Sequence, residues 1–96
     1  MKRRPACIVS SSAYNDQEPD VMLAMVTSSR NRLQRPGVGD VVLGDWQSAG
    51  LLRPSVVRTW RIFAIERRLL TLTLGNLTPT DLAAVDQALK AVLGLP

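Results

Sequence analysis

The apolar positions near the amino terminus fall into continuous runs, and such runs predict buried strands. Residues 6–11 begin with four apolar side chains and end in serines, and residues 21–27 are apolar up to a final threonine. Strands whose positions are all apolar are typically covered on both faces. We therefore expect strands over 6–11 and 21–27, separated by a polar loop over 12–20.

The middle of the chain is more polar and carries turn signals. Residues 28–39 are basic and contain Pro36-Gly37, which predicts a loop with a turn. A short strand is expected over 40–43, and one helical turn over 45–50, begun by Asp45 and ended by Gly50. A third long strand is expected from 55 to about 62 and a turn over 63–68. Residues 69–74 alternate Leu and Thr after the first leucine, and this period of two predicts a last strand.

The carboxyl-terminal segment carries the strongest helix signals. Thr78 can cap a helix whose first residue is Pro79, with Asp81 in its first turn and Gly94 at its end. Several apolar side chains share one face of that helix: Leu82, Val85, Leu89, Val92 and Leu93. Strands followed by one packed helix predict a mainly β fold with a C-terminal helix (α+β), built as a small barrel or a strongly curved sheet.

Length and composition limit the classes of protein. Ninety-six residues, 46% of them hydrophobic, predict a single domain over 1–96. No run reaches the roughly 20 apolar residues of a membrane span, and we expect a cytoplasmic protein. The lone cysteine, Cys7, is best interpreted as a small buried hydrophobe. The sequence has no histidine, which excludes histidine acid–base chemistry and histidine-ligated metals.

Charge points to an anionic partner. The net charge is +4, ten of the twelve basic residues are arginine, and eleven of the twelve lie before residue 69. The planar, permanently charged guanidinium suits phosphate. The charge predicts a polyanion or an acidic protein as partner. Arginine excess is also typical of genes with GC-rich coding sequences, so the charge alone does not establish an anionic partner.

Short motifs in order along nearly the whole chain carry a family resemblance. They are Arg-Arg-Pro-Ala at 3–6 with Ser-Ser-x-Ala-Tyr-Asn at 10–15, Val-Thr-Ser at 26–28, Gly-Asp-Val-Val-Leu at 39–43, Asp-Trp at 45–46 through Gly-Leu-Leu at 50–52, Pro-Ser-Val-Val-Arg at 54–58, and Leu-Gly-Asn-Leu-Thr at 74–78. In these motifs the chain resembles the MazF/PemK family of type II toxin–antitoxin endoribonucleases.

The resemblance implies an SH3-like barrel that forms a homodimer and cuts single-stranded RNA without a metal or other cofactor. Cleavage in the family uses attack of the 2′-hydroxyl on the phosphodiester. A cognate antitoxin occupies a groove near the active site, and DNA is expected to be contacted only through an antitoxin complex. No membrane contact is implied.

The resemblance also assigns residues. The catalytic arginine, which directly precedes a proline, falls on Arg4, and the catalytic threonine at a strand end falls on Thr27. Ser28, Arg30 and Arg58 are the expected substrate-binding residues; no metal ligands are expected. Trp60 stands where the PemK branch has an aspartate, and the branch's histidine is missing, so the Arg4/Thr27 version fits better.

Each assignment has a structural alternative. Arg4 could be a solvated terminal cation, Thr27 could bond only to backbone, and Arg58 could pair with Asp45 or Glu66. Trp46 is expected to pack in the core or at a dimer contact.

Family members usually have a Gly-Asp-Ile/Val strand and a mobile loop before the arginine that matches Arg4. Met1 lies just ahead of that arginine, so the barrel's first strand is expected to be missing and the chain to be an N-terminally short member. The second hypothesis is a remnant that binds an antitoxin or a paralogous toxin without cutting RNA. A double-stranded DNA binder fits less well, because no long basic helix is expected.

Overall fold

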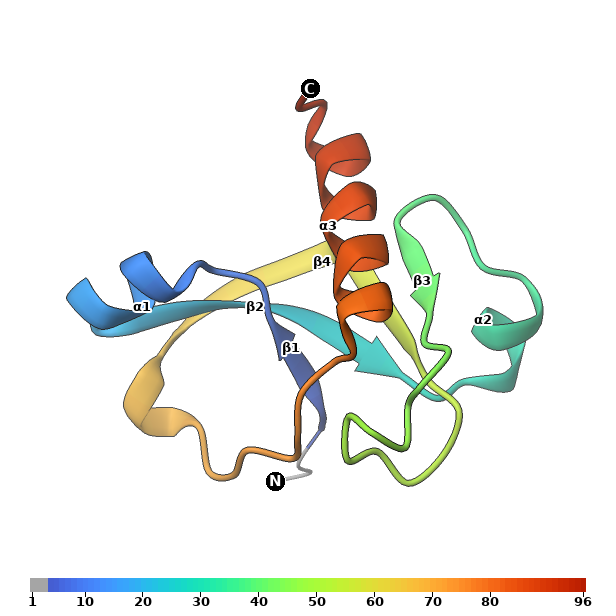
Figure 1. Cartoon of the computed structure of the whole chain (residues 1–96), viewed down its shortest axis with the longest axis horizontal. Helices are drawn as coiled ribbons and strands as arrows, with labels where there is room; N and C mark the ends of the chain where they lie inside the picture. The colour runs from blue at the N-terminus through green and yellow to red at the C-terminus, as the bar shows by residue number, and fades with distance from the viewer. Residues whose placement is uncertain (1–3) are drawn as a thin grey trace.

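The strands form one antiparallel sheet of four, in the order β1-β2-β4-β3 (Figure 1). The computed structural model describes residues 4–96. Its strands are β1 (Ala6–Ile8), β2 (Asp20–Thr27), β3 (Asp40–Val42) and β4 (Val56–Glu66). The sheet is strongly curled, because β2 and β4 are long, twisted together and bent around the helix that packs on them.

One long helix, α3 (Pro79–Leu93), packs against the sheet. Its Val85 belongs to the buried core cluster, whose other members come from the strands and the loop after β3: Ala24, Val26, Val41, Leu43 and Val57. Three shorter helical segments lie in the connections: α1 (Ser12–Gln17), α2 (Arg30–Gln34) and the 3₁₀ turn η1 (Arg67–Leu69). The mainly β fold with a C-terminal helix is therefore confirmed.

The start of α3 is fixed to the loop after β3 by a buried carboxylate. The side chain of Thr78 caps the helix by accepting a hydrogen bond from the backbone N–H of Asp81, as predicted. The carboxylate of Asp81 accepts hydrogen bonds from the backbone N–H groups of Gly44, at 3.0 Å, and Asp45, at 2.9 Å. Asp81 is only 6% exposed, so its carboxylate needs hydrogen-bond donors from the protein, and the two amides supply them.

The pairing of β2 with β4 contains one break in register. Thr27 lies opposite Val56 and Met25 opposite Arg58, but Ala24 lies opposite Ile62. Residues 59–61 of β4 therefore have no counterpart in β2 and form a bulge.

The bulge is fixed by contacts to the residue before β3. Both the backbone N–H and the buried hydroxyl of Thr59 donate to the carbonyl of Gly39, at 2.9 and 2.7 Å. Gly39 has a φ of +83°, and a Cβ there would lie 2.6 Å from Val92 of α3. Glycine is required because the bulge, the loop and the helix meet at this point.

Several expected boundaries were wrong. The loop expected over 12–20 contains α1, which Ser11 caps by accepting from the N–H of Tyr14. The loop expected over 28–39 contains α2, and the strand expected over 6–11 ends at Ile8. The turn expected over 63–68 was also wrong, because Asp20 of β2 pairs with Glu66 and β4 continues to that residue.

The last expected strand, over 69–74, was wrong as well. Residues 70–78 are irregular, and the described sheet has no strand beside them. Leu70, Leu72 and Leu74 are exposed, so their period of two does not mark a buried face. A segment becomes part of a sheet only where its backbone N–H and C=O groups pair with those of a neighbouring strand. Residues 45–50 make turns rather than a helix, and they end at Gly50 with a φ of +79°, as expected.

None of the helices described over 4–96 has the length and apolar character needed to cross a bilayer.

Replacing Asp81 by Ala tests the anchor of α3. The change removes the buried acceptor of the Gly44 and Asp45 amides, and we expect it to lower the free energy of unfolding by about 2–4 kcal/mol. Urea unfolding followed by circular dichroism measures the loss. Asp86→Ala, an exposed change on the same helix, is the matched control and should alter stability by about 0.5 kcal/mol or less. Equal losses in the two variants would contradict a structural role for Asp81.

Candidate functional site

A concavity of about 580 Å³ lies where the chain enters β1, β2 ends and β4 begins. It brings together three of the residues that the sequence singled out, namely Arg4, Thr27 and Ser28. The remaining described residues of its wall come from the neighbouring loops and strands: Pro5, Val26, Gly50, Leu51, Leu52, Arg53, Ser55 and Leu74.

Thr27 is held at the end of β2 in a defined orientation. It lies opposite Val56 in the sheet and is half-buried. Its hydroxyl oxygen accepts a hydrogen bond from the backbone N–H of Ser29 at 3.2 Å. The hydroxyl donates to no residue in the described part of the chain, so its hydrogen can be donated to a group in the concavity.

Two guanidinium groups give the concavity a positive charge. Arg4 and Arg53 both line it and both are exposed, and none of its described lining residues is acidic. Arginine stays protonated at any physiological pH and can bind two oxygens of one phosphate. An anion of phosphate size therefore finds two permanent cations and the hydroxyls of Thr27 and Ser28 in one place.

Arg53 was not recognised as a site residue from the sequence. The sequence feature that could have indicated it is its position: Arg53 lies two residues before the predicted strand that begins at 55, and Pro54 lies between them. The backbone carbonyl of Arg53 accepts a 2.8 Å hydrogen bond from the buried hydroxyl of Ser55, which fixes the backbone there. The pairing of Val56 with Thr27 then places this loop at the end of β2. That pairing could not be read from local sequence.

The other two expected substrate-binding residues lie outside this wall. Arg30 is the exposed first residue of α2. Arg58 is half-buried in β4 and lies over the ring of Trp60, with its guanidinium carbon 4.3 Å from the ring centroid. Within the described chain Arg58 makes no ion pair with Asp45 or Glu66, and Glu66 pairs with Arg68 instead. Trp46 packs against the core cluster, as expected.

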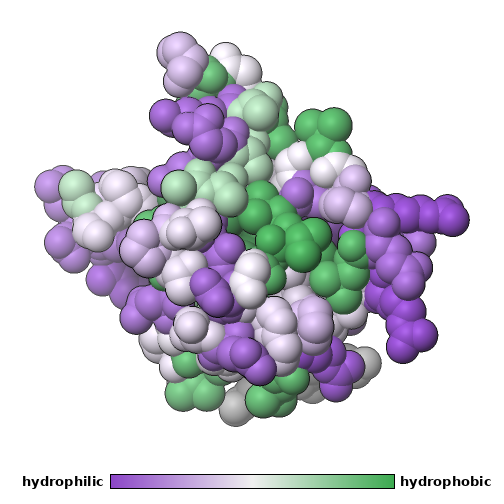
Figure 2. Space-filling model, turned by 45° about the vertical axis from the view of Figure 1, so that its right-hand side comes forward, coloured by the Kyte–Doolittle hydropathy of each residue, from purple (hydrophilic) through white to green (hydrophobic). Residues whose placement is uncertain are grey.

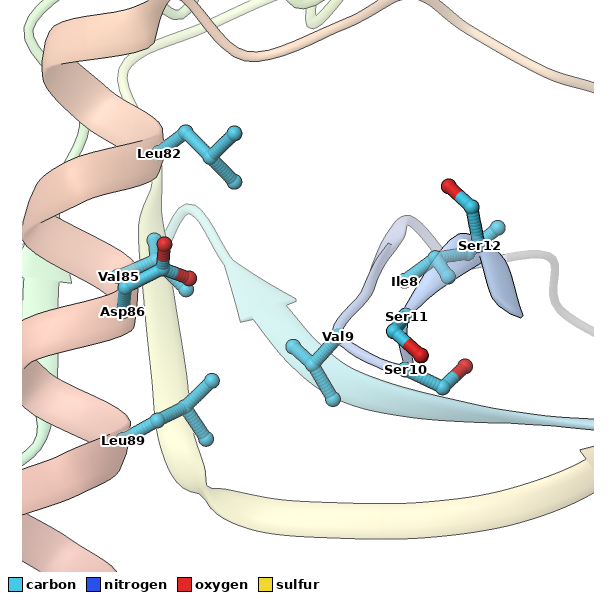
Figure 3. A pocket seen from close by; sticks show the side chains of 9 residues that line it. All are labelled: Ile8, Val9, Ser10, Ser11, Ser12, Leu82, Val85, Asp86 and Leu89. Carbon is cyan, nitrogen blue, oxygen red and sulfur yellow. The ribbon is translucent and has the colours of Figure 1, made fainter. Parts of the chain in front are cut away.

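A second concavity, of about 300 Å³, has a different chemistry (Figure 3). Leu82, Val85 and Leu89 project into it from α3, and residues 8–12 face them from the end of β1. Asp86 is the only charged side chain among its described lining residues. A pocket with one carboxylate and no cation among its described lining residues repels phosphate.

Its serines have structural roles. The Ser10 hydroxyl donates to the side chain of Asn15 and accepts from the N–H of Met22, and Ser11 caps α1. The hydroxyl groups of Ser10 and Ser11 are therefore already used in local structure.

Cys7 lies in β1, half-buried against the core cluster. Burial raises the pKa of the Cys7 thiol, and the nearby carboxylate of Asp86 raises it further. Both effects disfavour the thiolate, which is the reactive form. Within residues 4–96 no three potential metal-ligating side chains (His, Cys, Asp or Glu) gather at one point.

Comparisons with known proteins agree with this architecture. A family model described as "PemK-like, MazF-like toxin of type II toxin-antitoxin system" matches residues 1–93. An endoribonuclease from a mycobacterial species, solved in complex with its cognate antitoxin, is 30% identical, with a TM-score of 0.82 over 97% of this chain and 82% of that one.

Two other solved structures are similar. The MazE–MazF complex from Deinococcus radiodurans (Form-III) contains a chain that is 25% identical, with a TM-score of 0.77 over 98% of this chain and 88% of that chain. The Mycobacterium tuberculosis toxin MazF-mt6 shares the fold at 22% identity, with a TM-score of 0.81 over 97% of this chain and 88% of that one.

Alkylation by iodoacetamide measures the accessibility and ionisation of Cys7. We expect the native thiol to react at least about tenfold more slowly at pH 8 than the same protein unfolded in urea, because burial disfavours the thiolate. The folded state holds this proton to higher pH than the unfolded state, so Cys7 favours folding below its ordinary pKa, and that contribution falls as pH rises above it. Equal native and unfolded rates would contradict the assigned burial.

Proposed function

Since this chain belongs to the PemK-like, MazF-like toxin family of type II toxin–antitoxin systems, we propose that it is an endoribonuclease that cleaves single-stranded RNA and inhibits growth. The observation that supports this proposal best is the shared concavity of Arg4 and Thr27. These residues are 23 positions apart in sequence, and they reach the same point through the pairing of β1 with β2. The mycobacterial structure at 30% identity is described as an endoribonuclease.

The proposed reaction uses the RNA's own nucleophile. The 2′-hydroxyl oxygen forms a bond to the adjacent phosphorus, and the bond from phosphorus to the 5′-oxygen of the next nucleotide breaks. The 2′-hydroxyl loses its proton and the departing 5′-oxygen gains one, so that the products are a 2′,3′-cyclic phosphate and a 5′-hydroxyl. No water is added in this step.

The concavity suits the charge that develops in such a reaction. Negative charge increases on the two non-bridging oxygens as the phosphorus becomes five-coordinate. A guanidinium at Arg4 binds that charge more strongly in the transition state than in the ground state, which is the condition for catalysis. The free hydroxyl hydrogen of Thr27 can donate to the same phosphate. Arg53, facing the same space, adds a second cation for binding the strand.

We further propose that an antitoxin regulates this site and that the chain works as a homodimer. Two of the similar structures are described as complexes with an antitoxin or with MazE. An antitoxin segment bearing carboxylates would be attracted to the two arginines of the concavity, where no acidic lining residue opposes it. Binding there would exclude the RNA phosphate directly.

Arg4→Ala tests the assignment. We expect cleavage of single-stranded RNA, measured with purified protein in the presence of EDTA, to slow by about 10²–10³-fold, because a main source of transition-state charge stabilisation is lost. Thr27→Val, which keeps the shape and removes the hydroxyl, should slow it by roughly 10–100-fold.

Arg68→Ala is the matched control, because Arg68 is equally cationic, exposed and absent from the concavity wall. It should cut at nearly the parent rate. Circular dichroism checks that all variants remain folded. If Arg4→Ala and Thr27→Val cut as fast as Arg68→Ala, the site lies elsewhere.

A further inference from the structure

A cluster of three arginines surrounds an exposed tryptophan on the β3–β4 side of the molecule. The guanidinium carbon of Arg58 lies 4.3 Å from the ring centroid of Trp60, and those of Arg32 and Arg61 lie 5.9 Å from it. We call these four residues the Trp60 platform. Figure 2 shows strongly hydrophilic side chains gathered on its right-hand side, where Figure 1 places β3 and α2, beside an apolar area.

A buried aspartate fixes this platform from below. The Asp40 side chain is fully buried and accepts hydrogen bonds from the indole N–H of Trp60 at 3.0 Å, from the backbone N–H of Gly37 at 2.9 Å and from Arg32 at 3.4 Å. The indole N–H therefore already has its partner inside the protein. Trp60 is 43% exposed, so part of the residue is accessible to a ligand that stacks on its ring.

The platform has more positive charge than its own contacts use. Of its three guanidinium groups, that of Arg32 pairs with Asp40, whereas those of Arg58 and Arg61 have no carboxylate partner among the described residues. The Nε of Arg58 is buried without a hydrogen-bond partner among the described residues. An exposed aromatic ring beside two arginines that have no carboxylate partner in the described chain is a surface for anionic ligands that also carry a flat ring.

The platform lies on the same face of the sheet as Thr27. Met25 and Thr27 are two residues apart in β2 and so point to one side, and Met25 lies opposite Arg58. Diagonal neighbours of this kind are separated by about 7–8 Å, so Arg58 lies between the catalytic candidate and the ring of Trp60. A short length of single strand that enters the concavity can continue over this face.

We propose that the Trp60 platform binds a nucleobase next to the scissile phosphate, by stacking on Trp60 while the arginines contact the backbone. The proposal rests on the proposed function, because it takes single-stranded RNA as the ligand. An unpaired base can reach the ring, whereas a base inside a duplex is already stacked on its neighbours. Stacking is tolerant of sequence, so the platform contributes affinity and position rather than base identity.

Tryptophan fluorescence tests the proposal without any cleavage. In a Trp46→Phe background Trp60 is the only tryptophan, because the sequence has two. We expect a 2′-O-methyl oligonucleotide, which cannot be cleaved by 2′-hydroxyl attack, to quench this emission on binding. Heparin, a polyanion without bases, should bind without comparable quenching. Trp60→Ala should weaken oligonucleotide binding by about tenfold or more, and Trp60→Phe should restore most of it.

Phe63→Ala is the matched control, since Phe63 is a partly exposed aromatic residue farther along β4. It should leave binding unchanged. If RNA is cut but Trp60 is not quenched, the platform is wrong and the nuclease assignment stands. If Trp60 is quenched and no RNA is cut, the platform stands and the nuclease assignment fails. Quenching by an acidic peptide but not by the oligonucleotide would overturn the platform in favour of a protein-binding surface.

Discussion

The register in which β2 pairs with β4 decides which side chains meet at each end of the sheet. On one side of the register break, Thr27 opposes Val56 and Met25 opposes Arg58. This pairing brings the end of β2 to the start of β4. At the break itself, the bulge at 59–61 turns Trp60 toward the Asp40 side chain. Bulges are common beside functional sites because they re-aim a side chain without ending the sheet. The regular pairing therefore places the concavity, and the bulge orients the platform.

The two concavities described above differ in charge. The hollow at Arg4 has two guanidinium groups and two hydroxyl-bearing side chains with no acid in its described wall, whereas the one between β1 and α3 has a carboxylate and leucines. Only the first can lower the energy of a phosphorane-like transition state. The second belongs to the packing of α3, whose position is set by Asp81 through the amides of Gly44 and Asp45.

Local signals were enough for some elements and not for others. The cap at Thr78, the stop at Gly94 and the buried strand β2 follow from side-chain chemistry within a few residues, and the structure confirms them. The Leu/Thr alternation over 69–74 misled because no strand lies beside it in the described sheet. Arg53 was not foreseen as a site residue, and neither was the clustering of Arg58 with Trp60, because each depends on which residue of β4 faces which residue of β2 or β3. Arg4, Thr27 and Ser28 were named through family resemblance, and the structure places them on one wall.

In the proposed mechanism, the guanidinium of Arg4 and the strand-end hydroxyl of Thr27 assist attack by the RNA's own 2′-hydroxyl. The most direct test is a single-stranded RNA in which only the nucleotide before the cleaved bond carries a 2′-hydrogen. We expect this substrate to bind like the parent RNA and to remain uncut at that bond, while the parent yields a 2′,3′-cyclic phosphate end. Cleavage of the 2′-deoxy bond at the parent rate would contradict the mechanism.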